Sequence, residues 1–264
     1  MTQGTEDAET VLSTDSIGFG GLLGLGEAEG FSRADQAAHQ LETAITVGLL
    51  SNGERLPSEP ELASRLGIST ITLRQALASL RSRGIITTKR GRGGGSIVSD
   101  RALRSPRELA RRLRATSTEG LRDLGDVSTA VVSACARLAA LRADDQDVQR
   151  LLSLAQEFHD ASDLDTLRRT DSRFHIGLGV AAQSPRLTAA TVQVQGEFAP
   201  LLWAPATRLA DPGRAADEHL RIVEAITAGD AERAQALAVA HSERDAEAVV
   251  DAHLELVLAD PDDD

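Results

Sequence analysis

Apolar residues recur at helical spacing along most of this chain. From Ala37, the spacing of Leu41, Ile45 and Leu49 predicts an amphipathic helix that ends at the turn sequence Ser51-Asn52-Gly53. After residue 106, apolar periods of helical length predict helices near 106–115, 121–142, 145–160, 163–182, 185–206, 213–228 and 230–258. Their lengths and short connections predict an antiparallel all-α bundle of six or seven helices.

A motif with a sharp turn precedes this bundle. Ser58 and Glu61 have the spacing of a capping box, with Pro60 in the tolerant first turn, and predict a helix that runs to about Leu66. Gly67 breaks this helix. Ser69 is placed as the N-cap of the next one, whose inward face is Leu73, Ala76, Leu77 and Leu80. Two helices joined by such a turn predict a helix-turn-helix.

Two short β-branched runs follow the helix-turn-helix. Residues 85–88 and 96–98 predict two strands, and the segment between them is Lys89-Arg90-Gly91-Arg92-Gly93-Gly94-Gly95. A basic, glycine-rich hairpin behind a helix-turn-helix is the wing of a winged helix. The predicted fold is therefore mainly α, with an N-terminal winged helix-turn-helix and the C-terminal helical bundle.

Charge is unevenly distributed along the chain, although the total is −12. Residues 36–104 carry ten Lys or Arg against five acidic residues, a net +5, whereas residues 1–35 carry −6 and residues 105–264 carry −11. A basic footprint on phosphates belongs to a domain rather than to a whole chain. We therefore expect a DNA-binding domain at 36–104 and an effector-binding helical domain at 105–258. The flanking segments 1–35 and 259–264 are expected to be a disordered tail and an acidic tail.

The second helix of a helix-turn-helix enters the major groove N-terminus first, so its early outward residues reach the bases. The residues predicted to contact DNA on this helix are Ser69, Thr70, Thr72, Arg74 and Gln75. Glycines in the wing let the backbone approach a groove while cations meet phosphates. The contacts predicted there are Lys89, Arg90, Arg92, Gly93 and Gly94. On an isolated helix Arg74 and Gln75 would be ordinary solvated residues, and the basic wing is what favours DNA.

These segments also carry a family resemblance. The stretch from Gly53 to Glu59, then Glu61-Leu62-Ala63, Ile68-Ser69 and Leu73 to Leu77, with the wing ending in Val98, resembles the DNA-binding domain of GntR-type bacterial regulators. Two positions depart from that family, because Pro60 and Thr70 stand where it usually has arginines that contact DNA. The resemblance therefore implies that Arg74 and the wing carry more of the binding.

A second polar pattern lies in the helical region. Asp171 and His175 are four residues apart, so they project from one helix face and could bind one cation together. His219 and His241 lie on later predicted helices. One carboxylate and three imidazoles suit a divalent metal ion such as zinc, nickel or manganese. Spacing alone leaves open that these are surface residues or satisfied core residues.

The helical region resembles the FCD effector domain of the FadR-like branch of the GntR family. The resemblance rests on residues 171–175, Ser184-Pro185-Arg186-Leu187, Glu218-His219, 222–226, Gly229-Asp230, Ala234 and His241. It implies a metal held by Asp171, His175, His219 and His241, since the family commonly uses one Asp and three His. His39, His159 and His253 fall outside this pattern and are predicted to be surface residues.

The resemblance also implies a small organic acid as effector. Four protein ligands leave one or two positions of an octahedral ion open, and a carboxylate can fill them. Family members often place an Arg near Ser128 and a Glu near Val132, and this chain has neither. The effector contacts predicted in their place are Arg122, Ser128 and Gln193, beside the metal itself.

Together these features predict a cytoplasmic, homodimeric transcription repressor that binds palindromic double-stranded operator DNA and responds to the effector. No apolar run reaches the roughly 18–20 residues of a membrane span, so no membrane association is expected. A metal-dependent enzyme is disfavoured, because the His-Glu-x-x-His and paired Glu-x-x-His motifs are absent. An architectural DNA-binding protein with a purely structural metal site remains an alternative.

Overall fold

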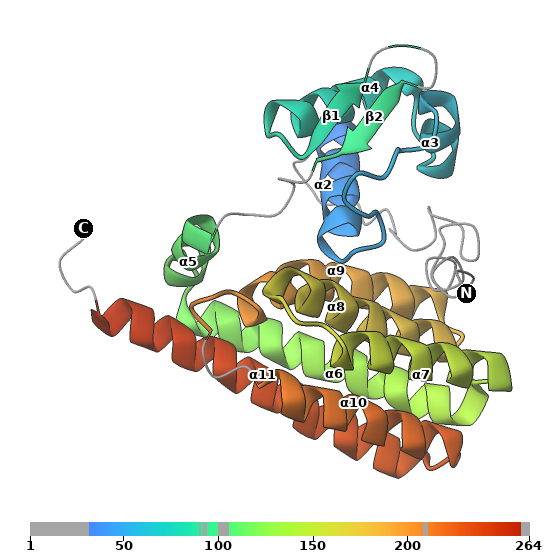
Figure 1. Cartoon of the computed structure of the whole chain (residues 1–264), viewed down its shortest axis with the longest axis vertical. Coiled ribbons are helices and arrows are strands. Elements are labelled where there is room, and N and C mark those ends of the chain that lie inside the picture. The colour runs from blue at the N-terminus through green and yellow to red at the C-terminus, as the bar shows by residue number, and fades with distance from the viewer. Residues whose placement is uncertain (1–31, 90, 92–93, 100–105, 208–210, 260–264) are drawn as a thin grey trace. The chain divides into compact units, whose positions relative to one another are not determined.

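The structure is a computed structural model of the chain, and it describes residues 32–89, 91, 94–99, 106–207 and 211–259. Contacts divide the chain into two compact units, Met1–Arg104 and Ser105–Asp264 (Figure 1). The predicted disordered tail lies outside the described residues up to position 31, as does the acidic tail from position 260. Residues 33–35, predicted as tail, are helical, because the Ser32 hydroxyl accepts a hydrogen bond from the Asp35 amide and starts the helix there.

The described residues of the first unit form three helices and a hairpin. The helices are α2 (Arg33–Thr46), α3 (Glu59–Arg65) and α4 (Thr70–Ser82). Strand β1 (Ile86–Lys89) pairs antiparallel with β2 (Gly95–Val98), and Arg55 adds a bridge to Ile97 at the outer edge of β2. The core of the unit includes Leu41, Ile45, Leu62, Leu73, Leu77, Leu80, Ile86 and Val98. This arrangement confirms the predicted winged helix-turn-helix.

The two N-caps of the helix-turn-helix differ. Ser69 caps α4 as predicted, because its hydroxyl accepts from the Thr72 amide at 3.1 Å. The predicted capping box at Ser58 is wrong, since that side chain makes no cap hydrogen bond. The Glu61 carboxylate instead pairs with Arg65 one turn along, at 2.7 Å. Between the helices, Gly67 adopts a φ of +65°, a left-handed conformation that glycine reaches without strain.

The second unit is all-α. The seven helices among its described residues are α5 (Pro106–Ala115), α6 (Thr118–Arg142), α7 (Asp145–His159), α8 (Leu164–Ala181), α9 (Pro185–Leu202), α10 (Pro212–Thr227) and α11 (Ala231–Ala259). The long helices α6 and α11 run side by side, with α10 packed along them (Figure 1). The mainly helical prediction is confirmed. The helix predicted at 185–206 is one turn too long, because α9 ends at Leu202.

Helix α6 lies at the centre of this unit and contacts α8, α9, α10 and α11. It carries Cys135, which is fully buried and whose thiol lies 3.6 Å from the Thr191 hydroxyl. Among the described helices, α6 is long and apolar enough to pass a length-and-hydropathy test for a membrane span, a test that the core helix of a soluble protein also passes.

Gly125 sets how closely α6 and α11 approach each other. A Cβ atom at this position would lie 2.7 Å from the Cβ of Ala246 on α11, closer than two carbons can pack. The opposing atom is fixed to the backbone, so a larger side chain at 125 can be accommodated only if the helices move apart. Gly213, in the first turn of α10, meets no such neighbour, since its nearest atom is the Asp211 Oδ1 at 3.5 Å.

Replacing Gly125 by Val should therefore lower the free energy of unfolding by about 1–3 kcal/mol, the usual cost of overpacking a core. The matched variant Gly213→Val, also in a helix, should change it by no more than about 0.5 kcal/mol. Urea denaturation followed by circular dichroism measures both. Equal stabilities for the two variants would show that the α6–α11 contact is not tight at this point.

Candidate metal centre and DNA-reading helix

Four polar side chains from three helices meet inside the second unit. Asp171 and His175 come from α8, His219 from α10 and His241 from α11, and one ligand atom from each lies within 4.8 Å of the others. All four are buried; none is more than 3% exposed. The structure thus brings together the four residues that the sequence singled out as a ligand set.

Hydrogen bonds at the rear of two imidazoles determine which ring nitrogen is free. The Nδ1 of His175 lies 3.0 Å from the backbone carbonyl of Asp171, and a carbonyl can only accept, so Nδ1 carries the proton. The Nδ1 of His241 lies 2.8 Å from Oε2 of Glu218 and donates to that carboxylate. In the neutral form of both rings Nε2 is therefore left with its lone pair. Partners behind metal-binding histidines fix their tautomers in the same way.

The inward-facing atoms of the cluster lie close together. The Nε2 of His219 lies 3.3 Å from Nε2 of His241 and 3.5 Å from Oδ1 of Asp171. Oδ1 of Asp171 is buried and has no hydrogen-bond partner among the described residues. A buried carboxylate oxygen without a partner is costly, and a cation would satisfy it. The donor set and this orphaned oxygen both fit a divalent transition metal.

Burial keeps two of the imidazoles neutral. It lowers the pKa of His219 well below the ordinary value, and it also lowers the pKa of His175 although Asp171 opposes the shift. Burial would lower the pKa of His241 too, but Asp245 and Glu218 together raise it above the ordinary value. Metal binding needs uncharged imidazoles, and burial keeps the rings of His175 and His219 uncharged at neutral pH.

Glu218 is held in place from its other side. Its Oε1 pairs with the guanidinium of Arg244 at 2.5 Å and lies 3.7 Å from that of Arg214. Burial acts to raise the pKa of Glu218, but the hydrogen bond from His241 and these arginines lower it below the ordinary value. Glu218 is thus an ionised carboxylate that orients the ring of His241. The sequence analysis did not assign it a role, although it directly precedes His219.

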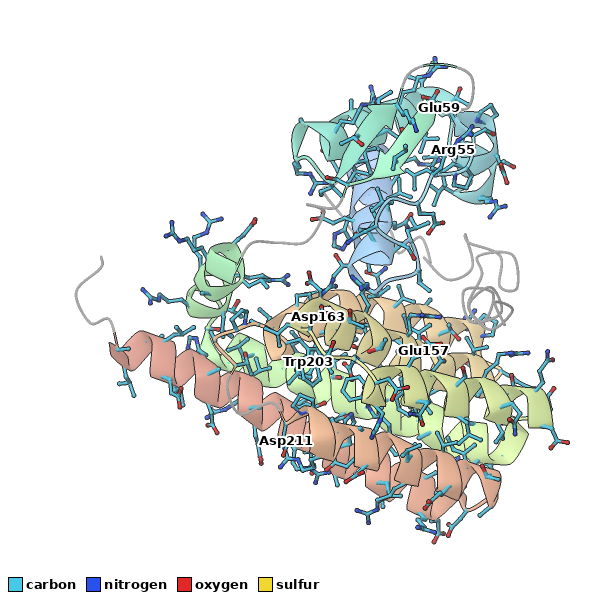
Figure 2. All side chains as sticks on the ribbon, in the orientation of Figure 1. Arg55, Glu59, Glu157, Asp163, Trp203 and Asp211 are labelled. Atoms are coloured by element: carbon cyan, nitrogen blue, oxygen red, sulfur yellow. The ribbon has the colours of Figure 1, made fainter. Side chains whose placement is uncertain are left out.

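Aromatic rings surround the cluster. The ring of Phe174 stacks on that of His219, with centroids 3.9 Å apart, and Phe158 lies 4.8 Å from the same ring. Phe158 also contacts Trp203, which directly follows α9 and is labelled in Figure 2. These contacts fix the His219 ring, whose Nδ1 has no hydrogen-bond partner in the described part of the chain.

The remaining histidines divide between surface and core. His39 and His159 are exposed, as predicted. The surface prediction for His253 is wrong. This side chain is only 6% exposed, because its Nδ1 bonds at 2.9 Å to the carbonyl of Leu113 at the end of α5. It is a structural link between α5 and α11.

The predicted effector contacts lie in different environments. Arg122 is exposed on α6, Ser128 is buried on the same helix, and Gln193 is half-buried on α9. A different cation, Arg168 on α8, is only 5% exposed, and burial lowers the pKa of its guanidinium to about 10. Gln195 is also buried, and its Oε1 has no hydrogen-bond partner among the described residues.

Several predicted DNA contacts lie on the first turns of α4. Thr70, Arg74 and Gln75 are exposed there. The guanidinium of Arg74 donates through Nε to the Glu59 carboxylate at 2.7 Å, which leaves both terminal nitrogens directed elsewhere (Glu59 is labelled in Figure 2). Thr72 is half-buried, and its hydroxyl lies 2.8 Å from that of Ser69, so both are engaged in the helix cap.

The sequence analysis passed over one exposed residue on this helix. Ile71 is 69% exposed, next to Thr70. An exposed isoleucine at the tip of such a helix can contact a thymine methyl group. In the wing, Lys89 is exposed and Gly94 is half-buried. Arg90, Arg92 and Gly93 lie outside the described residues.

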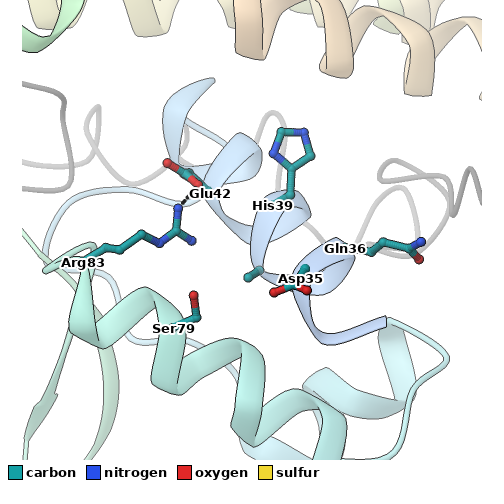
Figure 3. Close-up of a pocket in the computed structure, with 7 residues that line it drawn as sticks. Asp35, Gln36, His39, Glu42, Ser79 and Arg83 are labelled. Atoms are coloured by element: carbon teal, nitrogen blue, oxygen red, sulfur yellow. Dashed lines mark hydrogen bonds and ion pairs between the residues drawn. The ribbon is translucent and has the colours of Figure 1, made fainter. Parts of the chain in front are cut away.

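A hollow lies between α2 and α4 in the same unit (Figure 3). The residues that line it are Asp35, Gln36, Ala38, His39, Glu42, Ser79 and Arg83. At one side the guanidinium of Arg83 pairs with Glu42 at 2.5 Å. The hollow is separate from the Asp171–His241 cluster, which lies in the other unit.

Comparisons with known proteins agree with this architecture. Residues 33–94 match the model of bacterial regulatory proteins of the gntR family, and residues 123–256 match that of the FCD domain. The chain is 41% identical to the HTH-type transcriptional regulator RmpR of Mycobacterium gastri, over 86% of this chain and 84% of that protein. It is 28% identical to a protein of Escherichia coli (strain K12) named as an L-lactate dehydrogenase operon regulatory protein, over 79% and 83% of the two chains.

A solved structure shares the fold. Escherichia coli McbR/YncC superposes with a TM-score of 0.51 at 17% identity, covering 83% of this chain and 97% of that one. The matched family models and relatives describe transcriptional regulators and not enzymes. The chain therefore belongs to the GntR family of bacterial transcriptional regulators, with an N-terminal winged helix-turn-helix and a C-terminal FCD domain.

Proposed function

We propose that this protein is a cytoplasmic, homodimeric repressor. Its affinity for a palindromic operator would be controlled by a small organic acid bound near a divalent metal. The observation that carries the proposal is the buried cluster of Asp171, His175, His219 and His241 in a chain that also has a DNA-reading helix. In such a dimer, effector binding would favour one spacing of the two DNA-reading heads over another.

DNA recognition is assigned to the exposed face of α4 and to the wing. Because Nε of Arg74 is bound by Glu59, the guanidinium is held in one orientation with its two terminal nitrogens available to guanine or a phosphate. Thr70 and Pro60 supply no positive charge, so Arg74 is expected to carry an unusually large share of the binding energy.

Replacing Arg74 by Ala should weaken binding to the DNA upstream of the protein's own gene about 5- to 150-fold, the equivalent of one bidentate contact. The matched control is Arg81→Ala, which removes the same charge from the last turn of the same helix and should change affinity little. Gel-shift titrations at several salt concentrations measure both. If the Arg74 variant binds as tightly as the unchanged protein, α4 is not the DNA-reading helix.

The metal is assigned to Nε2 of the three histidines and to the Asp171 carboxylate. A bound divalent ion would supply a Lewis-acid position to which a carboxylate can bind. Glu218 orients one ligand from behind, and loss of such a partner commonly weakens metal binding.

The His219→Ala variant should be purified with little or no bound zinc, nickel or manganese, while the unchanged protein retains one of them. Glu218→Gln should weaken metal binding about 10- to 100-fold, as other losses of an orienting partner do. The control Glu224→Gln alters an exposed carboxylate on the same helix and should have no effect. Elemental analysis and chelator competition give the values, and equal metal content in the His219 variant and the unchanged protein would refute the ligand set.

An organic acid as effector is supported by the open positions of such an ion and by the name of the Escherichia coli relative, which refers to the L-lactate dehydrogenase operon. A screen of small hydroxy acids and dicarboxylic acids should find at least one that releases the protein from DNA. Release should be lost in the His219→Ala variant. If no acid changes DNA affinity, the architectural alternative with a structural metal gains support.

A further inference from the structure

A carboxylate outside the assigned ligand set faces the cluster from α11. Oδ2 of Asp245 lies 3.4 Å from Nε2 of His241. Asp245 is one turn after His241, the same spacing that places Asp171 and His175 on one face of α8. The family resemblance and the four-residue cluster both leave Asp245 without a role.

The position of Asp245 relative to the His241 ring distinguishes it from Glu218. Glu218 accepts the proton of Nδ1, at the rear of the ring, and so acts as an orienting group. Asp245 instead faces Nε2, the nitrogen that is assigned to the metal. A carboxylate oxygen at this distance from a ring nitrogen is placed either to share a proton with it or to bind the same cation.

The surroundings of Asp245 also suit a ligand better than a surface residue. Its side chain is only 15% exposed, so the carboxylate has lost most of its hydration. A buried carboxylate needs a positive partner. The neighbouring Arg214 and Arg244 pair with Glu218, so the ring of His241 is the cationic group that faces Asp245 when no metal is bound.

We propose that Asp245 is a fifth protein ligand of the metal. The inference rests on the proposed metal site and extends it. Two carboxylates would neutralise a divalent ion, and five protein donors would leave a single position of an octahedral ion open. The effector would then bind the ion through one donor atom, whereas an ion held by four protein ligands could be chelated through two.

Cobalt(II) is a suitable probe, because the position and intensity of its visible absorption bands respond to each ligand. The experiment compares Asp245→Ala and the near-isosteric Asp245→Asn with the unchanged full-length protein. The control Asp251→Ala removes an exposed carboxylate from the same helix. Circular dichroism before metal addition verifies that each variant is folded, and the Asn variant keeps the test valid if the Ala variant is not.

Both Asp245 variants should bind cobalt at least about tenfold more weakly and shift its absorption bands, whereas Asp251→Ala should match the unchanged protein. Unchanged affinity and spectrum in the Asp245 variants would overturn the fifth ligand but leave the four-residue site intact. Weaker binding with an unchanged spectrum would also overturn it, because Asp245 would then act outside the coordination sphere. If the unchanged protein binds no cobalt, zinc or nickel, the proposed metal site fails together with this inference.

Discussion

The helical unit depends on one constraint, which is that three imidazoles and a carboxylate are buried where α8, α10 and α11 meet. In an apolar core such groups are destabilising unless each finds a partner. Nδ1 of His175 is hydrogen-bonded to the backbone carbonyl of Asp171, and Nδ1 of His241 is hydrogen-bonded to the Glu218 carboxylate. The inner atoms face one another within 4.8 Å, so one shared cation would satisfy them together. On our account it would tie three helices that are far apart in sequence, and any ligand of that cation would act on all three.

The elements of the fold follow closely from the sequence, because apolar period and helix breakers act locally. The helix predicted at 230–258 runs from Ala231 to Ala259, and the one predicted at 106–115 has those bounds. Errors arose where side chains had a choice of partner. Glu61 pairs with Arg65 instead of completing a capping box with Ser58, and Ser32 starts α2 earlier than the apolar period suggested. Such competition between nearby polar groups cannot be decided from spacing alone.

The site was harder to predict, because spacing shows which side chains share a helix face but not how deeply that face is buried. The pair Asp171 and His175 was visible as an i,i+4 pattern, and the resemblance supplied His219 and His241. His253 was misplaced because its bond to the Leu113 carbonyl spans distant parts of the chain. Asp245 had a usable signal, since it repeats the same spacing after His241. The sequence carries no local signal for the pairing of Arg74 with Glu59, because this bond joins two helices across a turn.

The most direct test of the central claim is a crystal structure of the full chain, with anomalous diffraction recorded at the absorption edges of zinc, nickel and manganese. The account predicts one anomalous peak per chain, about 2.0–2.2 Å from Nε2 of His175, His219 and His241 and from a carboxylate oxygen of Asp171. Crystals of metal-supplemented protein without such a peak, or with an ion bound only elsewhere, would contradict it.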